Sequence, residues 1–532
     1  MRENPLHRRS AGILLHITSL PGPGPVGDIG PSAHRFVEFL ASAGQTFWQM
    51  LPIHPVGGGD SPYDSPSAFA GAPHLISLES LVDDGLLPPS SLPPPSLERD
   101  RVNFDEVRSV LPPLFREAFL EFERSERRPL RNDYEAFLAE NTSWVWDFAL
   151  YSALKRKFDD RPWFEWSHDL RRREPHVLEA AHRELSTAVR YHVFLQFCFH
   201  HQWARLRAHA RLLGVNFMGD VPMFVAHDSV DVWANQHAFF LDENGQRTVQ
   251  AGVPPDYFSE SGQLWGNPLY RWDTMREDGY GWWIDRLRRE FLKFDAVRLD
   301  HFIAFSRYWE IPITATSAKT GRFLPGPADD FFHAARRAFG ALPFVAEDLG
   351  IVTAEVEALR DRFQLPGMKV LQFAFNPGAE GYVPHRHTEN TVVYTGTHDN
   401  DTTRGWYDGV VTRAGSTTPL RRNDASTVDP DENEKFAAAI ELSRIEALSG
   451  TSQSVGVTPS LIRLLYATVS RTAIIRLQDA LNLDGSYRMN VPGVAHGNWT
   501  YRCRSEQLSS EIAENLRALA IVTERFEPEN QE

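Results

Sequence analysis

Three short apolar runs, each ending in a carboxylate, are the feature that most constrains the fold of this chain. They cover residues 296–300, 343–347 and 392–399 and end at Asp300, Glu347 and Asp399. Each run is only a few residues long and is flanked by helix-like sequence, a pattern typical of a buried parallel strand. In a parallel barrel, functional groups lie where strands end and βα loops begin. We therefore expect the three acids at one rim of one barrel.

Five further apolar runs complete an α/β fold, a (β/α)8 TIM barrel with large, mainly helical insertions in the βα loops. Amphipathic segments at 277–294, 329–339 and 353–363 predict helices between strands. The alternative is two doubly wound domains, which is disfavoured because no Gly-rich dinucleotide motif follows any strand. The eight expected strands cover residues 11–17, 47–54, 215–225, 296–302, 343–350, 368–375, 392–400 and 473–480.

The insertions determine the expected domain organisation, a single catalytic barrel over residues 1–532. Residues 55–214 form the expected mostly helical subdomain between strands two and three, and 178–213 are expected as one long helix that ends at Gly214. Residues 226–295 form a second insertion, between strands three and four, with a long Gly-, Pro- and aromatic-rich loop. Residues 409–434 are polar and low in core-forming side chains, so we expect a mobile loop there.

Composition narrows the possible partners and location. The 532 residues carry a net charge of −15, which argues against a nucleic-acid partner because phosphate backbones require clustered Lys and Arg. No stretch approaches about 18 uninterrupted apolar residues, so no membrane span is expected. The first residues lack an apolar segment of signal length, and the cysteines, Cys198 and Cys503, show no metal spacing. We expect a cytoplasmic protein.

Arg298 and Asp300 form the first candidate catalytic pair. Side chains at i and i+2 on a strand point to the same face, and a neighbouring Arg favours the ionised form of an Asp. An ionised, positioned carboxylate is what a nucleophile must be. The alternative interpretation is a purely structural Arg–Asp pair inside the barrel.

Glu347 is the candidate acid. Its strand is apolar, which favours a raised pKa and a proton available to a leaving oxygen. The neighbouring Asp348 points to the other face, and the residues alone do not decide between the two. Each also has a structural interpretation, as a helix cap or turn for Asp348 and as an ion pair for Glu347.

Polar residues gather around Asp399, between Thr395 and Thr403. Such density is expensive in a core unless the strand end faces a wet site. A metal site formed by His398, Asp399 and Asp401 is an alternative, but no second His cluster has ligand spacing. Asp220, at the end of strand three, adds a fourth acid that could bind sugar hydroxyls or brace Arg298. Acids at the ends of strands three, four, five and seven fit glycosidic-bond chemistry, which needs a nucleophile, an acid/base and a stabiliser.

At these residues the chain resembles the 4-α-glucanotransferases of the amylomaltase or disproportionating-enzyme type, glycoside hydrolase family 77 in the α-amylase clan. The resemblance runs through most of the chain. It is carried by Gly219-Asp-Val-Pro-Met-Phe-Val-Ala226, Ala251-Gly-Val-Pro-Pro-Asp-Tyr-Phe-Ser-Glu-Ser-Gly-Gln263, Trp265-Gly-Asn-Pro-Leu-Tyr270, Arg298-Leu-Asp-His-Phe302, Ala346-Glu-Asp-Leu-Gly350, Leu365-Pro-Gly-Met-Lys-Val-Leu-Gln-Phe373, Tyr394-Thr-Gly-Thr-His-Asp-Asn400, Arg488-Met-Asn-Val-Pro-Gly493 and Gly497-Asn-Trp499.

The resemblance implies a role for each matching residue. Asp300 resembles the family's nucleophile, Glu347 its general acid/base in preference to Asp348, and Asp399 its third acid, which holds sugar hydroxyls and stabilises the transition state. Further substrate contacts are implied for Asp220, Arg298 and His398 around the sugar, for Tyr63 as the aromatic platform, for Tyr257, Phe258 and Trp265 in a glucan-contacting loop within 226–295, and for Asn267 and Asn490.

The implied reaction is retaining transfer of part of an α-1,4-glucan donor to the 4-hydroxyl of glucose or a maltooligosaccharide. No metal or organic cofactor is expected, and no nucleic-acid or membrane partner; the expected state is a monomer or weak homodimer. The alternatives are an α-amylase-like hydrolase and a non-catalytic glucan-binding protein. Departures at Ile303-Ala304, at His227 and in the long 409–434 loop affect the expected chain-length preference rather than the reaction.

Overall fold

The computed structural model describes residues 4–94, 99–125, 128–255, 260–376, 378–415, 430–450 and 456–528. Its centre is a closed barrel of eight parallel strands in the order β1-β12-β11-β10-β9-β6-β3-β2, which confirms the predicted (β/α)8 fold. Their bounds are β1 Ser10–Leu14, β2 Phe47–Gln49, β3 Asn216–Val221, β6 Ala296–Leu299, β9 Phe344–Ala346, β10 Gly367–Val370, β11 Thr391–Tyr394 and β12 Thr472–Arg476.

The strands are shorter than the apolar runs that predict them. After β10 the chain enters a 3-10 helix over Leu371–Phe375, and after β12 it enters α18, Leu477–Ala480. Leu371, Ala374, Phe375 and Leu477 in these segments are buried although they lie beyond the ends of the strands. An apolar run therefore marks burial, and hydrogen bonding to neighbouring strands decides where each strand ends.

Helices cover the outside of the barrel through their apolar faces. In α11, for example, Trp283 and Leu287 are fully buried. Gly219 on β3 permits this close packing, because a Cβ there would lie 2.3 Å from the ring of Phe294, which follows α11. The covering helices are α1 Pro31–Ser42, α11 Gly281–Lys293, α13 Ala328–Phe339, α14 Ala354–Arg362, α17 Val457–Tyr466 and α19 Ser510–Val522.

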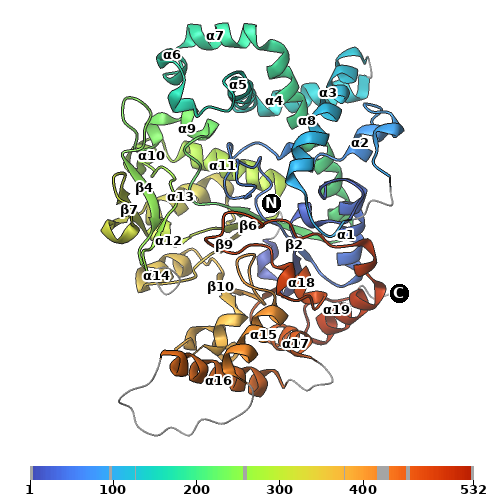
Figure 1. Ribbon diagram of the computed structural model, residues 1–532, viewed down its shortest axis with the longest axis vertical. Coiled ribbons are helices and arrows are strands. Elements are labelled where there is room, and N and C mark those ends of the chain that lie inside the picture. Colours follow the sequence, from blue (N-terminus) through green and yellow to red (C-terminus); the bar gives the residue numbers. More distant parts are fainter. Residues whose placement is uncertain are drawn as a thin grey trace.

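In the described part of the chain between β2 and β3 lie seven α-helices, which extend to one end of the molecule (Figure 1). The segment expected as one long helix at 178–213 is two helices, because Leu185 caps both α7 and α8. Asp228, in the loop after β3, accepts hydrogen bonds from Tyr151 and Lys155 of α5 and so attaches these helices to the barrel. Their bounds are α2 Leu78–Asp83, α3 Phe104–Arg124, α4 Arg128–Asn141, α5 Val145–Lys157, α6 His168–Arg171, α7 Pro175–Glu184 and α8 Ser186–Leu212.

A second sheet, which the sequence patterns did not predict, flanks the barrel. It is antiparallel, with the strand order β5-β4-β7-β8, and β4 and β7 are visible beside the barrel in Figure 1. Part of this sheet lies in residues 252–272, the Gly-, Pro- and aromatic-rich segment of the second insertion, which was expected to be a loop without strands. The strands are β4 Val249–Val253, β5 Gln263–Leu264, β7 Arg307–Pro312 and β8 Arg322–Pro325, and short helices α9 Val230–Ala234, α10 Trp272–Glu277 and α12 Ile303–Ser306 lie near them in the chain.

The expected mobile loop at 409–434 is wrong for the part of it that the structure describes. Helix α15 covers Thr403–Ala414 and α16 covers Pro430–Ser449, while 416–429 lie outside the described residues. The two helices pack against each other and against α17, which explains how a polar segment becomes helical: each helix needs only a narrow apolar stripe, such as buried Val410. No described helix has the length and apolarity needed to cross a membrane.

Candidate active site

The four acids proposed from the sequence lie at one mouth of the barrel, where its parallel strands end. In the sheet register Asp220 on β3 is paired with Arg298 on β6, and Leu299 is paired with Ala346 on β9. The amide of Glu347 donates to the carbonyl oxygen of Leu299 at 3.1 Å. Asp300 and Glu347 are therefore the first residues after two neighbouring strands, and Asp399 follows β11 on the same rim.

A buried arginine joins two of these acids. Nη1 of Arg298 lies 2.8 Å from both oxygens of Asp220 and 2.8 Å from Oδ1 of Asp300. Burial raises the pKa of Asp220, and the positive charge of Arg298 opposes that rise. Asp300 is 28% exposed whereas Asp220 is 1% exposed. Arg298 thus fixes one oxygen of Asp300 and leaves the carboxylate open to the mouth.

Glu347 has the surroundings of a group that exchanges a proton near neutral pH. It is 9% exposed. Burial, together with the negative charge of Asp300, raises its pKa to about 7 against the opposing charge of Arg298. The amide of His301 donates to Oε2 at 2.7 Å, and the amide of Leu349 donates to Oε1 at 3.1 Å. His301 has a φ of 50°, a left-handed conformation that is unusual for a residue other than Gly and often occurs at functional sites.

The neighbouring Asp348 is committed to a structural role. It accepts a hydrogen bond from the amide of Met368 at 2.7 Å and forms an ion pair with Arg360 of α14. Successive side chains at a strand end point in opposite directions, so Glu347 faces the mouth and Asp348 faces the helix layer. Of the two acids, Glu347 is the one that lies beside Asp300, and Asp348 is the one that is paired with Arg360.

A line of polar contacts connects Asp220, on β3, to Asp399, after β11. The hydroxyl of Tyr63 donates to Oδ2 of Asp220 at 2.7 Å and lies 3.3 Å from Nδ1 of His398. The two rings stack with their centroids 4.9 Å apart. Nε2 of His398 lies 3.3 Å from Oδ1 of Asp399, which also accepts a hydrogen bond from Asn490 at 2.6 Å. The structure thus joins these predicted residues in one cluster.

The other predicted substrate contacts are less central. The Trp265 indole is 36% exposed and meets the His301 ring edge-on at a centroid distance of 4.9 Å, so it borders the same mouth. The side-chain amide of Asn267 donates through Nδ2 to the carbonyl oxygen of Val225 and supports the loop after β3. Tyr257 and Phe258 lie outside the described residues.

Sequence reasoning missed two residues that contact the site. Arg488 donates to the backbone oxygens of Asp399 and Asn490. The Trp499 ring lies 5.9 Å from that of His398 and 6.1 Å from that of Tyr63. Both belong to C-terminal motifs quoted for the resemblance, and their proximity to Asn490 in sequence was the available signal.

The other sequence features have structural surroundings. His227 stacks on Phe164 with centroids 4.2 Å apart, and its Nε2 lies 2.8 Å from the carbonyl oxygen of Gly245. Ala304 is fully buried in α12. Among the described residues no three His, Cys, Asp or Glu side chains are arranged to hold a metal ion. Cys198 and Cys503 are both buried.

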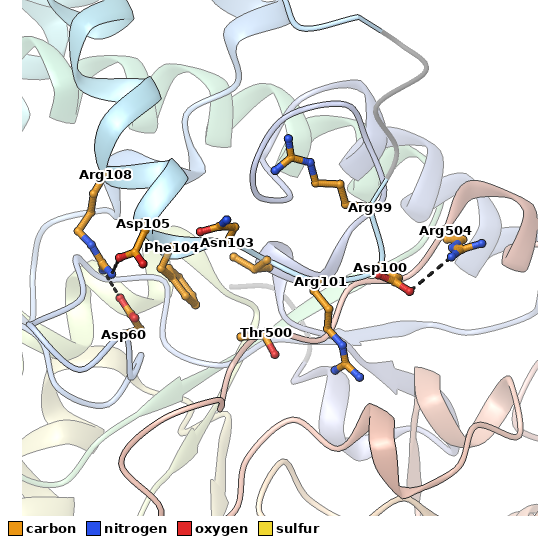
Figure 2. Close-up of a pocket in the computed structure, with 11 residues that line it drawn as sticks. Asp60, Arg99, Asp100, Arg101, Asn103, Phe104, Asp105, Arg108, Thr500 and Arg504 are labelled. Carbon is orange, nitrogen blue, oxygen red and sulfur yellow. Dashed lines mark hydrogen bonds and ion pairs between the residues drawn. The ribbon is translucent and has the colours of Figure 1, made fainter.

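A separate cavity of about 620 Å³ lies at the start of α3, and Figure 2 shows the residues that line it. None of the predicted site residues lines it. Among its charged groups, Arg108 pairs with Asp60 and Asp105, and Arg504 pairs with Asp100. Arg99 pairs with Glu106, outside the lining, and Arg101 donates to the carbonyl oxygen of Ser486.

Comparison with known proteins adds independent findings. The sequence model of glycoside hydrolase family 77, described as 4-alpha-glucanotransferase, matches residues 15–508. The 4-alpha-glucanotransferase of Thermus thermophilus is 44% identical over 97% of this chain and 99% of its own length, and that of Synechocystis is 41% identical over 98% of both. The structure of an amylomaltase from Streptococcus agalactiae in complex with acarbose matches with a TM-score of 0.87 and 35% identity, over 98% of this chain and all of that one.

Proposed function

The chain belongs to the 4-alpha-glucanotransferase family, glycoside hydrolase family 77, and we propose that it acts by a retaining double displacement on α-1,4-glucans. Membership makes it an enzyme, a 4-alpha-glucanotransferase of the amylomaltase type, as the sequence resemblance predicted. The proposal concerns the mechanism, the residues that perform it, and the sugars that the site accepts.

In the first half-reaction Asp300 attacks the anomeric carbon of the donor sugar while Glu347 protonates the glycosidic oxygen. The bond between the anomeric carbon and the leaving 4-oxygen breaks, and an ester bond to Asp300 forms. Arg298 holds one oxygen of Asp300 at 2.8 Å, which keeps the other oxygen available for attack. Glu347, with a pKa of about 7, carries its proton at neutral pH in a substantial fraction of molecules.

In the second half-reaction the 4-hydroxyl of glucose or a maltooligosaccharide attacks the same carbon from the face that the leaving group vacated. Glu347, now ionised, removes the hydroxyl proton, and the ester bond to Asp300 breaks. Two inversions at one carbon preserve the α configuration. Neither step needs a metal or an organic cofactor.

The surrounding residues have supporting roles in this proposal. Asp399, His398 and Asp220 bind the hydroxyls of the sugar between the acids, Tyr63 lies beneath its ring, and Asn490 orients Asp399. Trp265 contacts a neighbouring sugar of the chain. Asn267 supports the loop after β3 through its contact with Val225, and the contacts expected from Tyr257 and Phe258 stay predictions.

One observation carries the mechanism: two carboxylic acids at adjacent strand ends differ in their surroundings. Asp300 is partly exposed and fixed by a buried arginine, whereas Glu347 is buried with a raised pKa. A pair of acids whose environments favour opposite protonation states is suited to separate nucleophile and acid/base roles.

The test uses Asp300→Asn and Glu347→Gln, with Asp348→Asn as the matched control. We expect the first two to lose at least about 10³-fold of the transfer rate on maltotriose, and the control to keep its activity at a temperature where it is folded. With a glycosyl fluoride donor, whose leaving group needs no protonation, Glu347→Gln should accumulate a sugar ester on Asp300, found by peptide mass spectrometry. An ester on another residue, or an inverted product by NMR, would contradict the mechanism.

Product analysis on maltotriose also measures how strongly the acceptor site excludes water. Transfer gives glucose together with a ladder of longer maltodextrins, whereas hydrolysis gives short sugars alone. We expect the ladder to dominate. Short sugars alone would support the α-amylase-like alternative for this chain.

A further inference from the structure

The loop that carries His398 and Asp399 rests on a buried arginine, Arg476, at the end of β12. The guanidinium is 3% exposed and lies directly against Gly396. A Cβ at Gly396 would be 2.5 Å from Cζ of Arg476, so only Gly permits this approach. The arginine thus fills the space beneath the loop, on the side away from the open mouth.

Arg476 binds the backbone on both sides of Asp399. Its Nη1 donates to the carbonyl oxygens of Thr397 at 3.2 Å, Asn400 at 2.9 Å and Asp401 at 2.7 Å. Meanwhile Nε and Nη2 donate to the carboxylate of Asp479. One planar guanidinium thus serves the loop and Asp479 at fixed angles, which the single ammonium of Lys cannot do. Three carbonyl groups of one loop are therefore held in a fixed relation to one another.

Asp479 binds both Arg476 and the two ends of this loop. It accepts a hydrogen bond from Nε of Arg476 at 2.8 Å, from the hydroxyl of Thr395 at 2.5 Å and from the amide of Thr403 at 2.7 Å. Thr395 and Thr403 are the two ends of the loop. The buried ion pair consequently fixes the ends of the loop as well as its middle.

We propose that Arg476, paired with Asp479, is a positioning residue for Asp399 in the transfer reaction. The inference rests on the role proposed above for Asp399. Asn490 and His398 contact Oδ1 of Asp399, and the backbone that Arg476 binds sets the position from which the Asp399 side chain reaches them. A displacement of about 1 Å at a catalytic group can cost about 100-fold in rate.

The experiment compares Arg476→Lys with Arg525→Lys. Arg525 is also a buried guanidinium that donates to carbonyl oxygens, those of Tyr466, Ser10, Arg471 and Thr468, but at the opposite ends of β1 and β12. Both variants should lower the melting temperature. We expect Arg476→Lys to lower kcat by about 10- to 100-fold with KM changed less than about threefold, and Arg525→Lys to keep kcat within about twofold. Equal kcat values in the two variants would overturn the proposal.

A double-mutant cycle with Asp399→Asn tests whether Arg476 acts through Asp399. Measured with a glycosyl fluoride donor, Arg476→Lys should reduce the rate less than about threefold in the Asp399→Asn background, whereas additive losses would overturn the proposal. If Arg476→Lys does not fold, the neutral pair Arg476→Gln/Asp479→Asn takes its place with the same expected loss. Full activity of Asp399→Asn would instead contradict the proposed role of Asp399, which separates the two failures.

Discussion

Glu347 and Asp348 are adjacent carboxylic acids with opposite surroundings. Asp348 is paired with Arg360 and with the Met368 amide, whereas Glu347 faces Asp300 across the barrel mouth. The difference follows from the alternation of side chains at a strand end. The local environment of each side chain, rather than its residue type, therefore determines which of them can act as an acid.

The pKa of Glu347 predicts the alkaline limb of the pH profile. In the proposed mechanism donor cleavage requires the protonated form of Glu347, and burial raises the pKa of Glu347 to about 7. The protonated fraction then falls about tenfold for each pH unit above 7, so kcat/KM for the donor should fall with it. Initial rates on maltotriose between pH 5 and pH 9 would measure this. A glycosyl fluoride donor is the control, because its cleavage should lack that limb; a limb of the same midpoint there would assign the titration to another group.

The same pKa predicts that Glu347→Gln stabilises the fold at alkaline pH. The pKa of Glu347 in the folded protein lies above the ordinary value of 4.5. Ionisation of Glu347 therefore lowers the free energy of unfolding, by an amount that grows from about pH 4.5 and levels off above about pH 7. Gln carries no charge to bury. We expect the variant to be more stable than the natural chain by about 3 kcal/mol at pH 8 and by less than about 1 kcal/mol at pH 5, measured by calorimetry. A stability difference independent of pH would contradict this.

Tyr63→Phe should weaken the polar line between Asp220 and His398. The change removes the hydroxyl that contacts both and keeps the stacked ring. We expect kcat/KM to fall by about 10-fold, because Asp220 and His398 lose a shared partner. Leaving a buried polar group without its hydrogen bond costs about 1–3 kcal/mol. Tyr151→Phe is the matched control, since it removes a Tyr–Asp hydrogen bond, to Asp228, that is not part of the contacts among Tyr63, Asp220 and His398. Equal kinetics in the two variants would show that the Tyr63 hydroxyl does not act in the site.

At the scale of elements, the barrel strands were predictable because each is buried on both faces and so leaves a continuous apolar run. The second sheet left no such signal. Its strand β8 is largely exposed, with Phe323 at 42%, and β5 is two exposed residues. Pairing with β4 and β7 creates these strands, and pairing between distant segments has no local pattern.

The residues of the site likewise include some that the sequence predicts and some that it does not. Asp300, Glu347 and Asp399 were predictable because acids after apolar runs are unusual, and strand ends share a rim. Arg476 was not, because it acts on backbone oxygens of a segment about 75 residues away. Backbone carbonyl groups look alike in every sequence, so their partners appear only in the fold.

Helix α11 is attached to the barrel by a buried ionic cluster. Oε1 of Glu290 lies 2.9 Å from Nζ of Lys293 and 3.2 Å from Nε2 of His54, which follows β2. Although burial opposes its ionisation, the charges of Lys293 and His54 lower the pKa of Glu290 to about 2. Lys293→Met should destabilise the protein by about 3–5 kcal/mol, because it leaves a buried carboxylate without its cation.

The control for that prediction is on the same helix. Arg288→Ala removes an ion pair with Asp285 in which both side chains are more than half exposed, and it should cost less than about 1 kcal/mol. Chemical denaturation of both variants measures the difference. A Lys293→Met variant as stable as Arg288→Ala would mean that Glu290 becomes protonated inside the fold at little cost.

At the scale of the whole molecule, the first and last barrel strands close the fold. β1 pairs with β12, and Arg525, beyond α19, donates to the carbonyl oxygens of Ser10 and Arg471 where these strands begin. The opposite ends of the strands carry Arg476 and the site. Closure of the barrel and orientation of the Asp399 loop therefore depend on the same pair of strands, with buried arginines at both ends.

Net charge gives the last prediction, since the molecule carries −15 and the proposed donor is neutral. An electrostatic field does not steer a neutral sugar, and the buried Arg298 contacts are shielded from salt. Between about 50 mM and about 500 mM NaCl the Debye length shortens from about 14 Å to about 4 Å, yet we expect kcat/KM on maltotriose to change less than about twofold. A maltooligosaccharide oxidised to a terminal carboxylate is the control, and its rate should rise with salt as repulsion is screened. A neutral donor with the salt dependence of the charged one would mean that salt alters the site itself rather than the approach of the substrate.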